Sequence, residues 1–193
     1  MKTEELITAF KQGGAGNCVS VAAIKAAIEV FGLGNVFVAD SQVDGGLTIT
    51  MRDGISIVLT VTELEYAKEN SRFIMLDSQQ VFEYATLCYA AMAKRVQQDE
   101  KEEKLSYAEA VADLNDGASY LQGPNWLGLR HHVRAVGLKF IRQYDGVIGA
   151  SSKHCFFASH KLADDYGRVD PIQWLEIKYK FYHYVRLDPT PMY

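Results

Sequence analysis

The chain has 193 residues, of which 48% are apolar, and a formal net charge of −4. This length suits one domain with a sizeable core, and a mild negative charge without a basic stripe argues against a nucleic-acid partner. No apolar run is long enough to span a membrane, the start lacks the apolar core of a signal peptide, and three cysteines make no disulfide framework. A cytoplasmic location is therefore expected by default, with secretion by a signal-independent route left open.

The first third of the chain is predicted to contain two helices and a β-hairpin. A short helix is expected in MKTEELITAF. A second is expected over 19–31, where apolar residues recur at helical spacing and Gly32 follows as a stop. Strand signals follow in NVFVAD, LTITM and ISIVLTV, and the last two flank the turn pair Asp53-Gly54, which predicts a hairpin.

The middle of the chain is predicted to be helical. One helix is expected to begin at a Thr62 cap, and a long, largely buried helix is expected over 78–96. After a charged run, Ser106 and Glu109 have the spacing of a capping box and Gly117 follows as a helix stop. The segment YLQGPNWLGLRHHVRAVGLKF is expected to hold a loop and then another helix.

The end of the chain is predicted to be β structure. HCFFASHKL, YGRVD and QWLEIKYKFYHYVRL are rich in aromatic and β-branched residues, which favour antiparallel strands. The layout is therefore of the α+β class, in a single domain over 1–193. Residues 1–130 form its mainly helical part, with a β-hairpin, and 131–193 its mainly β part.

A lone cysteine, Cys18, stands where the helix over 19–31 begins. Free amides at a helix start stabilise a thiolate, so Cys18 is a candidate nucleophile, and Asn17 is placed to cap the helix. The Cys18 amide and the side-chain amide of Gln12 are candidates for an oxyanion hole. Glycines permit a tight loop here, so the backbone expected to lie along a substrate is that of Gly14, Gly16 and Asn17.

A nucleophilic cysteine needs a base and a group that orients it, and the late β region offers both. His154 is the favoured base, and Asp170 follows it by sixteen positions. A hairpin centred near Leu162 pairs His154 with Asp170, whereas one centred on ADDYG pairs His160 with Asp170. We favour His154 because its pairing leaves room for a wider loop, and His160 stays open as the alternative.

The remaining histidines and cysteines indicate neither a metal nor a cofactor. His131 and His132 lack the spacing of a metal motif with any other ligand-type residue. Cys88 lies within an apolar helix and is expected to pack in the core. Cys155 follows His154 directly in a predicted strand, so its side chain should point to the opposite face, into the core. No metal site is predicted, and no cofactor is expected.

The stretch QGGAGNC resembles the signature of papain-like cysteine peptidases in its calpain-type form. The matching residues are Gln12, Gly13, Gly16, Asn17 and Cys18. The order Cys, His, Asp and the 136-residue gap between Cys18 and His154 also fit papain-type enzymes. A second segment, from ATLCYAAMAKR to SYAEAVADLNDGASYLQG, is similar to the part of the calpain core in which a helix precedes a Ser-Tyr turn.

The resemblance implies a papain-like two-lobe fold and a peptidase with the catalytic residues Cys18, His154 and Asp170, with Gln12 in the oxyanion hole. An extended peptide or protein substrate would bind between the lobes. The chain departs from the family in carrying Asp170 for the usual asparagine, in its His154-Cys155 pair and in the displaced Trp174. Two alternatives stay open: a glutamine deamidase or acyltransferase on the same fold, and a non-catalytic binding module.

Overall fold

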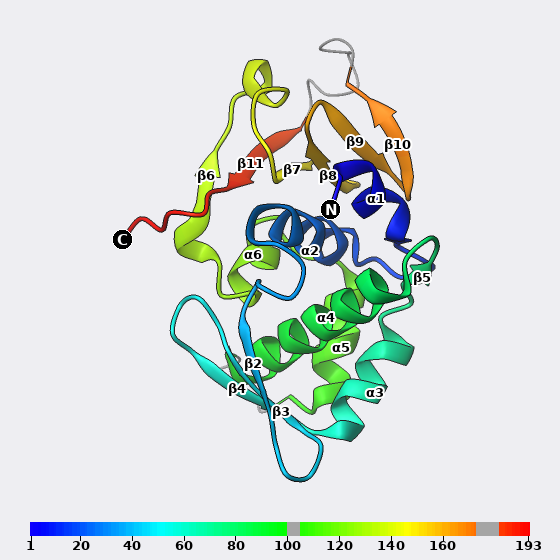
Figure 1. Cartoon of the computed structure of the whole chain (residues 1–193), viewed down its shortest axis with the longest axis vertical. Coiled ribbons are helices and arrows are strands. Elements are labelled where there is room, and N and C mark those ends of the chain that lie inside the picture. The colour runs from blue at the N-terminus through cyan, green and yellow to red at the C-terminus, as the bar shows by residue number, and fades with distance from the viewer. Residues whose placement is uncertain (100–104, 173–181) are drawn as a thin grey trace.

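The computed structural model describes residues 1–99, 105–172 and 182–193 and has an α+β architecture with antiparallel sheets. Every α-helix of the described residues ends by residue 126, and a six-stranded sheet follows. Figure 1 shows the sheet on one side of helix α2 and a group of helices on the other. Among the described residues, no helix is both long and apolar enough to cross a bilayer.

Helix α2 (Cys18–Phe31) is the central element of the fold and confirms the helix predicted over 19–31. Every residue from 19 to 28 is buried, because the helix packs against the sheet on one side and against α4 (Gln79–Asp99) and α6 (Gln122–Trp126) on the other. It ends at Gly32, whose φ of 90° lies in the region that favours glycine.

The other helices agree with the sequence except at one start. Their bounds are α1 (Thr3–Ala9), α3 (Val61–Asn70) and α5 (Tyr107–Asp116). The capping box of Ser106 and Glu109 before α5 is confirmed, and so is the stop at Gly117. The predicted Thr62 cap is wrong: Thr60 caps α3, because Glu63 stands three positions after it and completes a capping box with it.

The predicted hairpin forms two strands of a three-stranded sheet. Its strands are β2 (Val38–Ser41), β3 (Leu47–Thr50) and β4 (Ser56–Leu59), in that order. The turn between β3 and β4 contains Gly54, at a φ of 82°, so the hairpin around Asp53-Gly54 is confirmed. Two short strands, β1 (Phe10–Lys11) and β5 (Ile74–Met75), pair beside the loop that precedes α2.

The six-stranded antiparallel sheet has the order β10, β9, β8, β7, β11, β6. The bounds of its strands are β6 (Val133–Ala135), β7 (Val147–Ala150), β8 (Cys155–Ser159), β9 (Leu162–Asp165), β10 (Arg168–Pro171) and β11 (His183–Leu187). Cys155 and Phe157 of β8 join the main core with α2, whereas Phe156 and Ala158 join a smaller core on the opposite face. This alternation follows from the pleat.

Over 120–140, where a loop and then a helix are predicted, the chain forms strand β6 and otherwise only short helical turns. These are α6 and two 3₁₀ turns, η1 (Arg130–His132) and η2 (Leu138–Phe140). The part of the last predicted strand that contains Trp174 lies outside the described residues, and β11 forms its end.

Candidate active site

Cys18 is the first residue of α2 and is partly exposed. The first amides of a helix have no partner within it, so the Cys18 N–H is a free donor by position. The glycine loop before it packs tightly: a Cβ added at Gly13 would lie 2.1 Å from the Arg72 carbonyl oxygen, and one at Gly16 would lie 2.8 Å from that of Asn115. The loop therefore needs both glycines to place Cys18.

The side chain of Asn17 does not cap α2, so that prediction is wrong. Asn17 occupies the N-cap position, but its Nδ2 donates to the Ser71 carbonyl (2.7 Å) and to Asn115 Oδ1 (2.8 Å). Asn17 is 1% exposed, so its side chain faces the interior and not a substrate. The buried carbonyl of Ser71 needs a hydrogen-bond donor, and Asn17 provides it in place of capping the helix. Asn17 therefore connects the loop to two segments that are distant in the sequence.

A groove of about 510 Å³ runs past Cys18, with residues 116–120 on one wall and 150–154 on the other. Gln12, Gly16, Cys18 and His154 all line it. A second, much smaller hollow of about 10 Å³, the room that one water molecule needs, is also lined by Gln12, Cys18 and His154. Gln12 and Cys18, which are close in the sequence, thus meet the distant His154 in one place. Gly14, which was also predicted to lie along the substrate, does not line this groove; it is exposed, and a Cβ added there would meet no atom within 4 Å.

The Gln12 side chain folds over the glycine loop, where its Nε2 donates to the Ala15 carbonyl. An amide nitrogen carries two hydrogens, so a second donor is left for a substrate oxygen. Gln12 and Cys18 line both the groove and the hollow, so their two amide donors remain the candidates for an oxyanion hole.

His154 is half-buried and held at the start of β8. Its N–H donates to Ser151 Oγ (3.1 Å), and its carbonyl accepts from the Ser151 N–H (2.9 Å). Burial lowers the pKa of the imidazole, and the nearby carboxylates of Asp164 and Asp165 oppose that effect. A histidine in this setting is neutral at neutral pH and ready to accept a proton.

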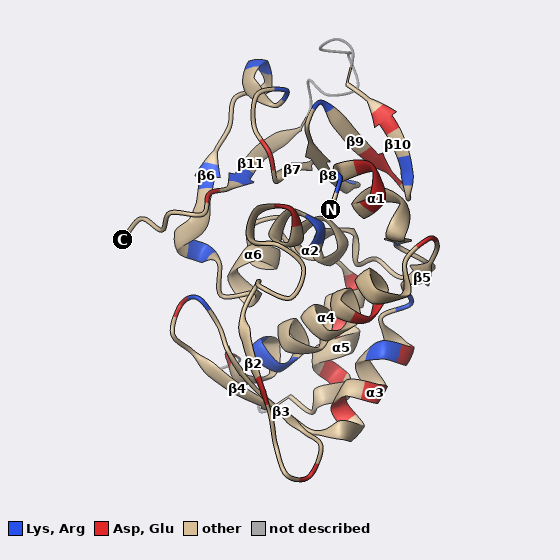
Figure 2. Cartoon of the chain, viewed as in Figure 1, with Lys and Arg blue, Asp and Glu red and all other residues tan. Residues whose placement is uncertain are grey.

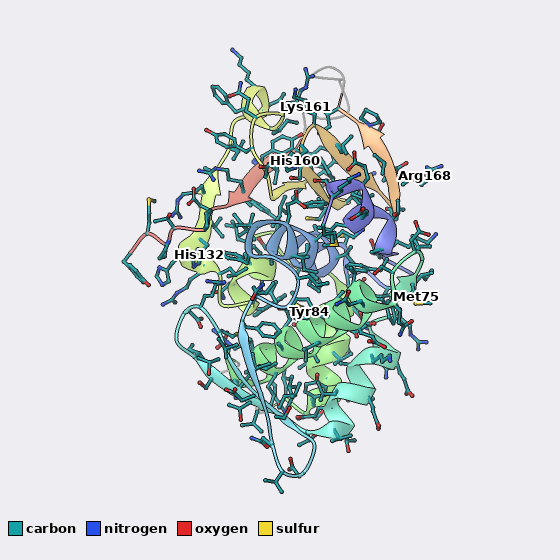
Figure 3. The ribbon with its side chains drawn as sticks, viewed as in Figure 1. Met75, Tyr84, His132, His160, Lys161 and Arg168 are labelled. Carbon is teal, nitrogen blue, oxygen red and sulfur yellow. The ribbon has the colours of Figure 1, made fainter. Side chains whose placement is uncertain are left out.

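The alternative base, His160, is bound elsewhere. Its Nδ1 lies 3.0 Å from Glu29 Oε1 and 2.9 Å from Thr3 Oγ1. Glu29 follows Cys18 by eleven positions on α2, which corresponds to about 16 Å along the helix axis. His160 sits in the β8–β9 turn with Lys161, among the strands drawn above α2 (Figure 3). The structure therefore brings His154, and not His160, to the cysteine.

Both predicted registers for Asp170 are wrong. The chain turns twice after His154, at His160-Lys161 and at Tyr166-Gly167, so Asp170 lies on β10 opposite Ala163. That is two strand spacings, about 10 Å, from the strand that His154 begins. Asp170 and His154 both line a third cavity of about 110 Å³. The expected role of Asp170 as the orienting group stays a prediction.

The sequence reasoning missed Asp164, a carboxylate that does line the small hollow with Cys18 and His154. Its Oδ2 lies 2.7 Å from the fully buried Lys25 Nζ, and its Oδ1 accepts from the Gly167 N–H (2.6 Å). Asp164 thereby fastens β9 to α2. The β9–β10 hairpin carries several acidic residues beside α1 (Figure 2), and only the register distinguishes this one.

Tyr166 was also missed, because a tyrosine in a turn carries no signal of its own. Its ring stacks on His154 with centroids 4.7 Å apart, and its Oη lies 3.3 Å from His154 Nδ1. The Gly167 that follows it marks the turn in the sequence, but not what the turn covers.

The chain's other two thiols are unsuited to nucleophilic chemistry. Cys88 and Cys155 are buried, as predicted, and burial raises the pKa of each thiol, so both stay protonated. In the described part of the chain, no group of three histidine, cysteine or acidic side chains is arranged to hold a metal ion.

Comparison of the chain with protein-family models, with curated proteins and with solved structures found no match. What can be said of function rests on the residues around Cys18.

Proposed function

We propose that the chain is a cysteine hydrolase that cleaves peptide bonds through a covalent thioester at Cys18. The observation that carries the proposal is that Cys18, His154 and Gln12 line the same groove and the same hollow beneath it. The three residues come from a helix start, a strand start and a glycine loop. Nucleophile, base and oxyanion donor are the parts that acyl transfer requires.

The reaction follows from these roles. His154 takes the thiol proton as Cys18 Sγ bonds to the substrate carbonyl carbon, and the oxygen becomes an oxyanion that the Cys18 amide and Gln12 stabilise. His154 then gives the proton to the leaving amine as the C–N bond breaks and the thioester forms. Water, deprotonated by His154, attacks the thioester, and Cys18 leaves with the proton that His154 returns.

The groove suits an extended peptide. It has room for several side chains at about 510 Å³, and hydroxyl and small residues line both walls, among them Ser119, Ser151 and Ser152. A papain-like fold, as the QGGAGNC motif suggests, is part of this proposal, and the sequence assigns the orientation of His154 to Asp170. Asp170→Asn tests the latter.

The test is turnover of a mixed fluorogenic peptide pool by the wild type, Cys18→Ala and Cys88→Ala. We expect Cys18→Ala to fall to background and Cys88→Ala, which removes a thiol outside the groove, to keep wild-type activity. Mass spectrometry of a treated protein mixture then identifies the reaction. Cleaved peptides are the expected products, whereas a deamidation shift without cleavage would replace the proposed peptidase by a deamidase.

A further inference from the structure

The side chain of Tyr166 covers His154 at the edge of the groove. The two rings are nearly parallel, at 19°, and Tyr166 Oη lies 3.3 Å from His154 Nδ1. Tyr166 lines both the groove and the hollow beside Cys18, yet 51% of its surface is exposed. Its ring therefore lies against His154 at the edge of the hollow that Cys18 also lines.

Tyr166 also has an unfavourable backbone. Its φ is 51°, and Gly167 after it has a φ of 84°, so these two residues form the two-residue turn between β9 and β10. Turns of this kind favour asparagine, aspartate or glycine at the first position, because a bulky side chain is strained in the left-handed region. A tyrosine held in such a conformation beside a nucleophile indicates a role in the site.

The chemistry of His154 defines that role. To accept the proton of Cys18 on Nε2, the neutral imidazole must carry its own hydrogen on Nδ1, and the imidazolium carries hydrogens on both nitrogens. In both states Nδ1–H needs an acceptor, and the Tyr166 hydroxyl oxygen is in reach of it. Burial raises the pKa of Tyr166, as does the negative charge of Cys18 when it is a thiolate, so the phenol stays neutral.

We propose that Tyr166 is a positioning residue for His154, accepting a hydrogen bond from Nδ1–H and stacking on the imidazole so that Nε2 faces Cys18. This inference rests on the proposed function. The phenol thus performs the task that the sequence assigned to Asp170. When the proton of Cys18 Sγ moves to Nε2, the resulting imidazolium keeps its bond to Tyr166 Oη, and its positive charge lies against the face of an aromatic ring. No proton passes to the phenol.

The experiment compares Tyr166→Phe, which keeps the ring, with Tyr166→Leu, which removes ring and hydroxyl. Tyr144→Phe is the matched control, since Tyr144 lies outside the groove and its ring, which the variant keeps, packs under Arg186. For each we would measure kcat and KM on a peptide substrate and the pH profile of Cys18 alkylation by iodoacetamide. Thermal unfolding reports whether each variant is folded.

We expect Tyr166→Phe to lower kcat about tenfold and to leave KM unchanged, because a tenfold change in rate corresponds to the loss of one neutral hydrogen bond. The alkylation profile should shift upward by about one pH unit, because the imidazolium that pairs with the thiolate is less stable. Tyr166→Leu should lower kcat about a further tenfold as stacking is lost. A purely structural role would change unfolding and leave the pH profile in place.

A third variant, Tyr166→Asn, separates the positioning role from the backbone strain of the turn. Asparagine suits the turn, so this variant should unfold at a higher temperature than the wild type and still lose activity. Wild-type kcat and an unshifted profile for Tyr166→Phe would overturn the inference while Cys18→Ala stayed inactive. Full activity of Cys18→Ala would instead overturn the proposed function.

Discussion

Replacing Lys25 by methionine tests how α2 is anchored beneath the nucleophile. Lys25 is 0% exposed, and its Nζ donates to the carbonyls of Ile7 and Phe10 (both 2.8 Å) and to Asp164 Oδ2 (2.7 Å). Removing one partner of a buried ion pair leaves an uncompensated charge and costs about 3–5 kcal/mol. For a chain of this size that corresponds to a fall of about 6–20 °C in Tm.

The assay is denaturant and thermal unfolding of Lys25→Met beside Arg168→Met. Arg168 pairs with Asp165 in the same hairpin, at 2.7 Å, but its side chain is 80% exposed, so its loss should lie within experimental error. The double variant Lys25→Met/Asp164→Leu should lose less than the two single losses combined, because no charge is left unpaired. A loss below about 1 kcal/mol for Lys25→Met would refute the reasoning, since a buried pair of this kind has to exceed that value.

Three further predictions concern the glycine loop, His154 and Asp170. Gly16→Ala should lower the free energy of unfolding, measured by chemical denaturation, by about 1–3 kcal/mol, because its Cβ would lie 2.8 Å from the backbone oxygen of Asn115. Gly14→Ala is the control and should be neutral, because a Cβ there would meet no atom within 4 Å. Equal losses for the two variants would contradict the tight packing at Gly16. Burial lowers the pKa of His154, so just below the ordinary histidine pKa of about 6.5 the unfolded state binds more protons than the folded state. The free energy of unfolding should therefore rise with pH through that window, and this contribution is lost as the pH falls through the folded-state pKa. His154→Gln should flatten this part of the stability curve, and an unchanged slope would contradict the burial of the imidazole. Asp170→Asn should reduce kcat by less than Tyr166→Phe does, since Asp170 lies opposite Ala163; a loss of a hundredfold or more in steady-state kinetics would restore it as the orienting group.

The elements fixed by local signals could be predicted from the sequence. Apolar spacing and a terminal glycine define α2, and the capping box of Ser106 and Glu109 defines the start of α5, because both depend on neighbours within one or two turns. Cys18 was recognisable for the same reason, since its loop, its helix and Gln12 are contiguous. The predicted cap of α3, Thr62, was wrong because Thr60 caps the helix, and an error of this size is usual where the end of a helix is predicted from sequence.

What could not be predicted depends on contacts between distant segments. The side chain of Asn17 serves Ser71 and Asn115, which no local rule reveals. The place of Asp170 depends on two turns, one of which, His160-Lys161, contains no glycine although both residues have positive φ. The turn predicted at ADDYG pairs Asp170 with His160, whereas the observed turn pairs it with Ala163, three positions further on. His154 could therefore be nominated from the sequence, but its neighbours could not.

The most direct measurement of the central claim, that His154 activates Cys18, is covalent labelling by a peptidyl epoxide, read by intact mass and peptide mapping. Wild type and His154→Ala would be compared at equal concentration, with His160→Ala as the matched control. We expect one label, on Cys18, formed rapidly by the wild type and His160→Ala and far more slowly by His154→Ala. Equal labelling rates for all three proteins, or a label on Cys88 or Cys155, would contradict it.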